Sequence, residues 1–131
     1  MSATGGRLGR DRGSAAVELA VTMPALLLAL LLIVHIGLWQ HARHVAQAAA
    51  REGARVARGY DGTAAAGRNR AEGYVGALAP RLLAGPTVTA SRAATDATVR
   101  VRARVVSVLP WPRLVVDESS TGPVERFVPR R

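Results

Sequence analysis

Three histidines are the side chains in this sequence best suited to binding a metal or moving a proton. His41 and His44 are three residues apart and would share one face of a helix. No acidic residue near them supplies a third ligand, and zinc sites need three or four ligands. We therefore expect no metal site, and we interpret His35, His41 and His44 as polar residues at an interface.

Other catalytic patterns are missing from the sequence. The chain has no cysteine, which excludes a disulfide, a thiolate metal site and a cysteine nucleophile. It also contains no phosphate-binding glycine loop, dinucleotide fingerprint, His-Glu-x-x-His motif or nucleophile elbow. We expect no enzymatic activity, no cofactor and no small-molecule substrate.

All 18 basic residues are arginine, and they outnumber the 9 acidic residues to give a formal net charge of +9. Guanidinium groups bind phosphate in a bidentate way, and Arg100, Arg102 and Arg104 form a stripe that suits this role. A solvated strand face explains the stripe equally well, because strands with one wet face alternate in this manner. The arginines are scattered and hardly interleaved with aromatic residues, so we expect no nucleic-acid partner.

A long apolar segment dominates the first third of the chain of 131 residues. Residues 19–39 carry no charge and contain only Thr22 and His35 as polar side chains. About 20 apolar residues in a helix span the roughly 30 Å hydrocarbon core of a bilayer. We therefore predict a transmembrane helix with its membrane span at about 19–40, in contact with the lipid bilayer, and Trp39 as an interfacial anchor in the aromatic belt.

Glu18 lies at the start of this apolar segment and requires an explanation. A carboxylate at the edge of hydrocarbon is costly unless it finds a partner or lies at the interface. One interpretation is that Glu18 ends the membrane segment in the headgroup zone. The other is that Glu18 has a specific partner.

The elements that follow are predicted from periodicity. An alanine-rich run without proline extends the helix to about residue 58, with Glu52 facing Arg55 at the three-residue spacing. After a turn at 59–62, Thr63 is expected to cap a second helix that reaches about Leu83, although Pro80 disfavours its last turn, and Gly85-Pro86 closes the element. Its predicted apolar side consists of Ala66, Tyr74, Ala77, Leu78 and Leu82.

From Thr87 onward the period changes from 3.6 to 2, which indicates strands. Two strands, at 87–91 and 99–105, are joined by a turn around Asp96, a third is predicted at 114–118, and 124–128 is a candidate fourth. The predicted fold class is therefore α+β and membrane-anchored: a long N-terminal transmembrane helix that extends into a soluble helix, a second helix, and a small antiparallel sheet of 3–4 strands.

Small residues line one part of the predicted long helix. Close helix approach and simple helix propensity both explain them. These residues are Ala46, Ala49, Ala50, Gly53, Ala54 and Ala57.

Taken together, these features resemble a known family. A basic leader is followed by the run Gly13-Ser14-Ala15-Ala16-Val17-Glu18-Leu19-Ala20, an uninterrupted apolar helix and the run Ala50-Arg51-Glu52-Gly53-Ala54-Arg55. This arrangement is similar to the TadE-like family, pseudopilins of the Flp/Tad type IV pilus system. The close resemblance covers residues 12–58, and the remainder agrees with the family in pattern only.

The resemblance implies a processing site and an assembly residue. A prepilin peptidase would cleave between Gly13 and Ser14, so that Ser14 carries a new amino terminus and Glu18 becomes the fifth residue of the mature chain. Glu18 would then pair with the α-ammonium group of a neighbouring subunit and fix the axial register. The chain accordingly divides into a basic leader (1–13), a transmembrane and extended helix (14–58) and a small extracytoplasmic α+β domain (59–131).

Three hypotheses for function follow. The first is a minor pseudopilin in the assembly of a Tad/Flp-type pilus or related secretion machinery, with prepilin peptidase and other pilin, pseudopilin or Tad platform subunits as partners. The second is an uncleaved single-pass envelope protein whose outer domain binds a partner. The third is a secreted protein cut near the Ala48-Ala49-Ala50 run. Arginine counts on the two sides of the span do not orient it. The shortness of the leader and the resemblance together lead us to expect the N-terminus in the cytoplasm, the helix in the inner membrane and the body outside.

Overall fold

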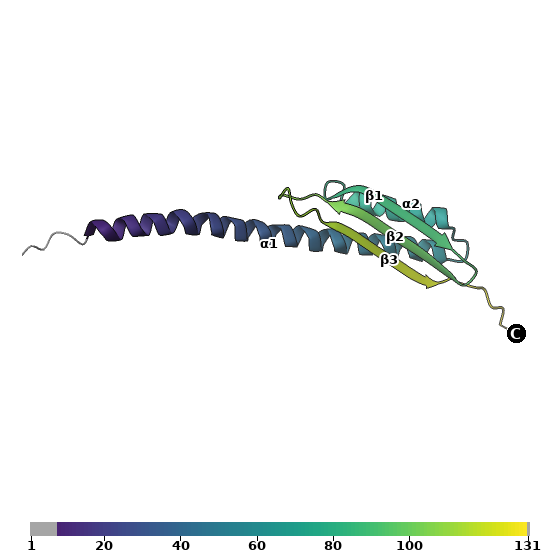
Figure 1. The fold of residues 1–131 in the computed structure, drawn as a ribbon. Helices are drawn as coiled ribbons and strands as arrows, with labels where there is room; N and C mark the ends of the chain where they lie inside the picture. Colours follow the sequence, from purple (N-terminus) through teal and green to yellow (C-terminus); the bar gives the residue numbers. More distant parts are fainter. Residues whose placement is uncertain (1–7, 131) are drawn as a thin grey trace, which may run out of the picture. The chain divides into compact units, whose positions relative to one another are not determined.

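The computed structural model describes residues 8–130, which form two helices and three strands (Figure 1). In chain order these are α1 (Leu8–Arg58), α2 (Ala64–Leu78), β1 (Leu83–Arg92), β2 (Asp96–Val105) and β3 (Val115–Pro123). The chain divides into two compact units, one that ends at Val34 and one that starts at His35. The predicted α+β class, with a long apolar helix, a second helix and a small antiparallel sheet, is confirmed.

Helix α1 begins earlier than the predicted leader boundary. Residues 8–13 of the leader are helical, and residues 1–7 lie outside the described part of the chain. The helix ends at Arg58, immediately before the glycine-rich turn that the sequence indicates. Gly62 is needed in that turn because a Cβ there would collide with the Val56 carbonyl oxygen.

The sheet has the order β1-β2-β3 with both pairs antiparallel. Val101 in the central strand faces Val88 of β1 and Glu118 of β3 in the register. Along β2 the residues alternate between buried and exposed, with Val99 and Val101 fully buried and the intervening arginines in solvent. The alternation predicted for this strand is therefore confirmed.

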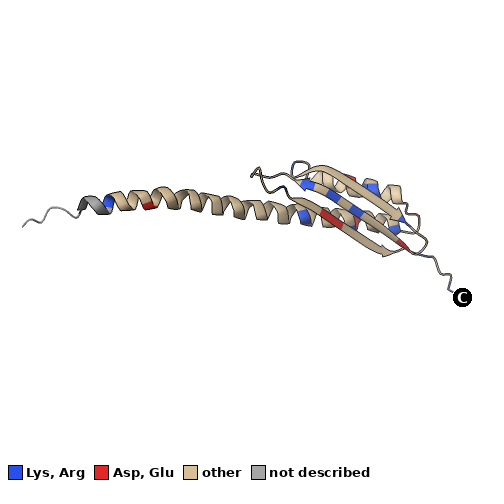
Figure 2. Cartoon of the chain, viewed as in Figure 1, with Lys and Arg blue, Asp and Glu red and all other residues tan. Residues whose placement is uncertain are grey.

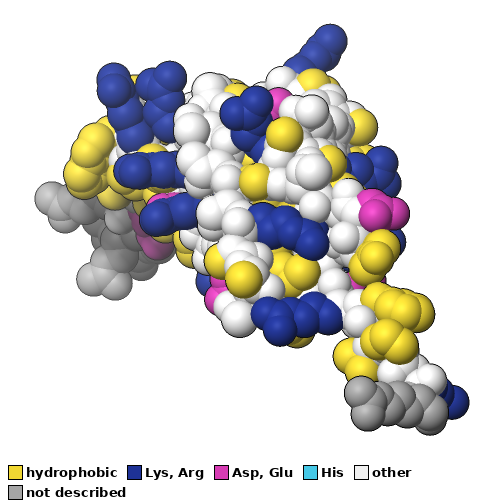
Figure 3. Space-filling model, turned by 90° about the vertical axis from the view of Figure 1, so that its right-hand side faces the viewer, with side chains coloured by type: hydrophobic (Ala, Val, Ile, Leu, Met, Phe, Trp, Pro, Cys, Tyr) yellow, Lys and Arg dark blue, Asp and Glu magenta, His cyan; other side chains and the backbone are white. Residues whose placement is uncertain are grey.

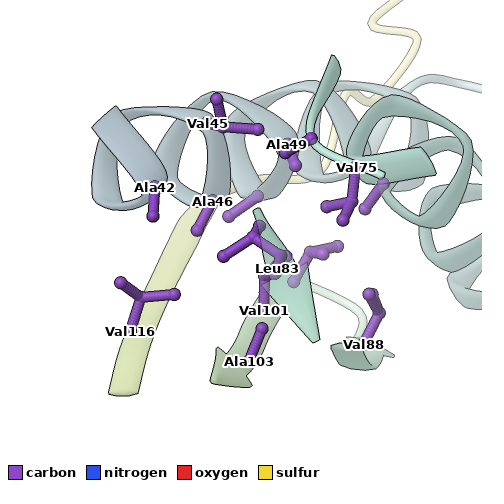
Figure 4. Close-up of a cluster of buried hydrophobic side chains, with 14 of the residues drawn as sticks. Ala42, Val45, Ala46, Ala49, Val75, Leu83, Val88, Val101, Ala103 and Val116 are labelled. Carbon is purple, nitrogen blue, oxygen red and sulfur yellow. The ribbon is translucent and has the colours of Figure 1, made fainter. Parts of the chain in front are cut away.

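The core of the second unit lies between the sheet and the helices. Figure 4 shows side chains from α1, α2 and all three strands converging on one cluster. Apart from Leu83, every buried hydrophobic residue of this core is an alanine or a valine. Because these side chains are short, the layers of the body must lie close together to exclude water.

Helices α1 and α2 make their closest approach at two glycines. A Cβ on Gly53 would lie 2.6 Å from the Gly67 carbonyl oxygen, and a Cβ on Gly67 would lie 2.7 Å from the Gly53 carbonyl oxygen. A Cβ on Gly67 would also lie 2.7 Å from the Ala57 Cβ, and Ala50 and Ala54 of α1 are buried in the core cluster. Of the two explanations for the small residues, close approach is therefore the one that the structure supports.

The apolar side predicted for α2 was right in part: Tyr74 and Leu82 pack against the core cluster, but Ala77 and Leu78 are exposed. Gly67, Ala71 and Val75 are the buried residues, whereas Leu78 is 56% exposed. The prediction selected the larger apolar residues, but the side that packs closely on the backbone of α1 must carry the smallest ones. The predicted cap is confirmed, since Thr63 accepts a hydrogen bond of 3.0 Å from the Ala66 amide.

The end of α2 and the start of β1 also differ from the prediction. The helix ends at Leu78 because Pro80 has no amide hydrogen and forces the preceding residue, Ala79, out of the helical region. Strand β1 then begins at Leu83, so Gly85-Pro86 lies within a strand. Gly85 has a φ of 57°, and the register shifts between Ala84 and Thr87, which identifies a β-bulge.

The candidate fourth strand at 124–128 does not form. Strand β3 extends to Pro123, and the two amides that follow are bonded elsewhere: Val124 donates to the Thr95 carbonyl and Glu125 to the Arg58 carbonyl, each at 2.9 Å. Neither bond belongs to the strand pairing of the sheet. The sheet therefore has three strands within residues 8–130.

The glycine contact between α1 and α2 gives a stability prediction. Replacing Gly53 by alanine should lower the free energy of unfolding by about 1–3 kcal/mol, because the new methyl group overpacks the interface. Gly76→Ala is the matched control, since a Cβ at that position of α2 meets nothing within 4 Å. The control should stabilise the protein by up to about 1 kcal/mol through helix propensity.

Urea unfolding of the full chain in detergent, followed by circular dichroism, measures both variants. An equal change in the free energy of unfolding for Gly53→Ala and Gly76→Ala would contradict the close contact between α1 and α2.

Candidate assembly site on helix α1

The part of α1 before His35 exposes an unusual amount of apolar surface. All large apolar side chains from Val17 to Ile36 are between 42% and 69% exposed. Removing one such side chain from water is worth about 1.5–3 kcal/mol. Among the described residues, α1 is the one helix long and apolar enough to cross a membrane, and lipid would satisfy this surface.

The predicted processing and assembly residues lie at the start of this apolar surface. Ser14 and Glu18 are exposed and, four residues apart in α1, lie on one face of the helix. A Cβ on Gly13 would meet nothing within 4 Å, so packing does not require a glycine there. Figure 2 shows an acidic residue near the start of α1, followed by a long run without charge that ends at a basic residue.

Trp39 lies where the apolar segment meets the body. Its ring is half-buried against the core cluster, and the Arg43 guanidinium carbon lies 5.8 Å from the ring centroid. Arg43 in turn donates to Glu118 of β3 at 2.7 Å. The predicted interfacial anchor is thus also a packing residue that positions an ion pair between α1 and the sheet.

His35 is buried, with 3% of its surface exposed, and contacts the loop between β2 and β3. Its Nδ1 lies 3.1 Å from the Ser107 hydroxyl oxygen. That hydroxyl donates its single hydrogen to the Leu109 carbonyl at 2.6 Å, so His35 Nδ1 must be the donor in the first bond. The histidine therefore ties α1 to the loop, and sequence analysis gave no indication of Ser107.

Glu52 connects α1 to α2 through two arginines. Arg55 donates to both carboxylate oxygens, at 2.7 and 3.2 Å, and Arg70 of α2 donates at 3.1 Å. The hydrogen bonds from Arg55 and then Arg70 lower the pKa of Glu52 from 4.5 to about 2. The Arg55 contact follows from the three-residue spacing, whereas Arg70 is a tertiary partner that no local pattern indicates.

Backbone carbonyls at the C-terminal end of α1 accept hydrogen bonds from residues that are distant in sequence. Arg92 of β1 donates from one guanidinium nitrogen to the carbonyls of Ala57 and Gly59, the latter at 2.8 Å. The Glu125 amide donates to the Arg58 carbonyl at 2.9 Å. Helix ends leave carbonyls without partners inside the helix, and these bonds satisfy them.

The arginine stripe of β2 is partly paired on the outer face of the sheet. Arg100 donates to Asp117 of β3 at 2.6 Å, and this bond lowers the pKa of the Asp117 carboxyl. Figure 3 shows arginine side chains spread over several parts of one face of the body, with acidic side chains among them. Within residues 8–130, no three His, Asp or Glu side chains are grouped to hold a metal ion.

The fold and the exposed helix define a class: a small α+β body joined to one helix that is long and apolar enough to cross a membrane. Residues 13–55 match the family model described as TadE-like protein. The match begins at Gly13 and lies wholly within α1, so the resemblance predicted for this segment is confirmed and associates the chain with Tad pilus systems. No curated protein and no solved structure shows a significant match.

The Glu52 contacts predict a pH dependence of stability. Because folding lowers the pKa of Glu52 from 4.5 to about 2, the unfolded chain binds more protons between these values. The stability that these contacts provide is therefore fully present above pH 4.5 and is lost as the pH falls toward 2. Glu52→Gln should be less stable than the parent protein at pH 7, and this difference should disappear on acidification.

Urea unfolding of the full chain in detergent at a series of pH values measures the difference. Glu72→Gln is the control, because Glu72 makes one exposed ion pair with Arg68, at 3.7 Å, and its loss should change little. A stability difference for Glu52→Gln that is independent of pH would contradict the assignment.

Proposed function

We propose that this chain is a minor pseudopilin that acts in the assembly of a Tad/Flp-type pilus or a related secretion machinery. In this proposal α1 crosses the cytoplasmic membrane once, with the N-terminus in the cytoplasm and the body outside. The role is structural, not catalytic. The observation that carries the proposal is the TadE-like match from Gly13 to Arg55, over a helix whose apolar side chains are exposed.

The geometry of α1 supports the assembly role of Glu18. Cleavage after Gly13 would place a positive α-amino group on Ser14, about 6 Å along the helix from Glu18, at 1.5 Å per residue. Both groups would lie at the edge of the apolar segment, where an unpaired charge is costly. Pairing the amino group of one subunit with the carboxylate of its neighbour offsets both desolvation costs and sets one axial offset between the helices.

The helical state of residues 8–13 favours a second candidate. The bond between Gly13 and Ser14 lies inside α1, and a peptidase would have to unwind this turn to reach it. Glycine weakens a helix by about 1 kcal/mol relative to alanine, so Gly13 eases that step. A chain that keeps its leader would instead be a single-pass envelope protein whose outer body binds a partner.

The body argues against a cut near Ala50. Ala42, Ala46 and Ala49 are all fully buried in the core, and they precede such a cut. Removal of this part of α1 would leave one face of the sheet open to water. A conventional signal peptide that ends near Ala50 is therefore incompatible with the packed body.

Cleavage is tested by the mature N-terminus. Mass spectrometry of the protein from its own host should find Ser14 as the first residue. Gly13→Leu should abolish cleavage and leave the leader attached, whereas the control Gly9→Leu should be cut normally. A parent protein that retains Met1 would establish the uncleaved alternative.

The register role of Glu18 is tested by Glu18→Gln, which keeps the size of the side chain and removes its charge. We expect normal amounts of the protein in the membrane but a severalfold loss of cross-linked pilin partners. Thr22→Val, one helical turn further on, is the control and should leave partner recovery unchanged. Undiminished cross-linking of Glu18→Gln would overturn the register role.

A further inference from the structure

The loop between β2 and β3 is the most apolar exposed part of the body. Trp111 is 80% exposed, Val108 is 54% exposed and Val106 is 48% exposed. The loop spans residues 106–114, and Arg113 is its one charged residue. Soluble proteins rarely expose so many apolar side chains together unless the surface contacts a partner or a membrane.

The position of this loop along α1 is fixed by the bond between Ser107 and His35. His35 lies within the predicted membrane span, four residues before Trp39, which corresponds to about 6 Å along the helix. Both residues belong to the same compact unit as the loop. Because residues 35–40 of the predicted span belong to this unit, a loop bonded to His35 contacts a residue that is itself predicted to lie within the bilayer.

Charges and apolar groups at this end of the body suit an anionic lipid surface. The Val106 amide donates to the Leu82 carbonyl at 2.8 Å, which brings the segment that follows α2 to the same end of the sheet. Residues 78–82 and 104–115 include Arg81, Arg104 and Arg113 but no acidic residue. Basic side chains beside apolar ones favour the headgroup region of anionic bilayers.

The opposite end of the body has a different character. There the Glu125 amide donates to the Arg58 carbonyl and the Val124 amide to the Thr95 carbonyl. The turns at this end include Asp61, Asp96 and Glu125, and they also include Arg92, which donates to the Gly59 carbonyl, and Arg126, which donates to the Ala94 carbonyl. Acidic side chains are repelled by anionic lipid. The segments at the end with the 106–114 loop thus carry arginines without acidic residues, whereas the opposite end mixes charges of both signs.

We propose that residues 106–112 form a second membrane contact, in which Val108 and Trp111 insert into the headgroup and upper acyl region of the outer leaflet beside α1. This inference rests on the proposed membrane insertion of α1, and it is independent of cleavage and of pilus partners. Tryptophan is favoured at this depth because its ring is apolar and its N–H is polar. The loop also covers His35, which shields a polar side chain from hydrocarbon.

Single cysteines test the contact, because the chain has none of its own. Val108→Cys and Val128→Cys form a matched pair, one in the loop and one at the opposite end of the body, and both valines are exposed. Each full-length variant is labelled with the fluorophore NBD and inserted into vesicles of phosphatidylcholine and phosphatidylglycerol. Trp111→Cys and Phe127→Cys provide a second pair in case one substitution disturbs folding.

The loop labels should emit at shorter wavelength and lose most of their fluorescence when the vesicles contain lipids with a nitroxide near the headgroup. The labels at 127 and 128 should emit as in water and remain unquenched. If the protein floats with the vesicles but the loop labels emit as they do in water, the loop contact is overturned and the transmembrane anchor is unaffected.

Two other outcomes would also overturn the inference. Loop labels shielded from water but not quenched by lipid would mean that a second copy of the chain covers the loop. Failure of the protein to float would remove both the loop contact and the transmembrane anchor. Neither result depends on the Ser14 terminus or on Glu18, which test the pseudopilin role separately.

Discussion

The distance at which α1 approaches its neighbours is the constraint on which the body depends. Gly53 and Gly67 bring the two helix backbones together, and the alanines on either side continue the same close contact along α1. Burial of apolar area is modest for each alanine, so stability has to come from many contacts at short range. This explains why the core contains almost no large side chains and why its central strand presents valines to the helices.

One helix serves two different surroundings because its composition changes along its length. Before His35 the apolar side chains include many leucines and are exposed, which suits contact with hydrocarbon. From Ala42 onward the residues of α1 that are buried against protein are mostly alanine. Between these parts, the His35 Nδ1 bonds the Ser107 hydroxyl, and the Arg43 guanidinium lies over the Trp39 ring and pairs with Glu118, whereas the buried His35 Nε2 has no hydrogen-bond partner among the described residues.

Local patterns in the sequence predict the elements whose signals are short and unambiguous. The strict alternation in β2, the Thr63 cap and the end of α1 at Arg58 all belong to this class. The buried side of α2 is not predictable from hydrophobicity, because a glycine and an alanine become core residues only when another backbone lies against them. Gly85-Pro86 was misassigned for a related reason, since the same dipeptide suits a turn and a bulge.

In the candidate site, too, residues that form a local sequence pattern were predicted and residues that act through tertiary contacts were not. Gly13, Ser14 and Glu18 are visible in the sequence because they form one contiguous run, and the run matches a family model. Ser107, Arg92 and Arg70 were missed because each acts on a residue that is remote in sequence, and such pairs leave no local signal. Their roles depend on the tertiary arrangement of the second unit, which only the structure provides.

The bonds at the C-terminal end of α1 have a mechanical consequence. A helix whose last carbonyls meet only water frays when it is pulled, because its final turn has few bonds to lose. Here Arg92 carries the load from this end into β1, and Glu125 carries it into the segment that follows β3. Tension applied along α1 is thus shared between β1 and the segment that follows β3.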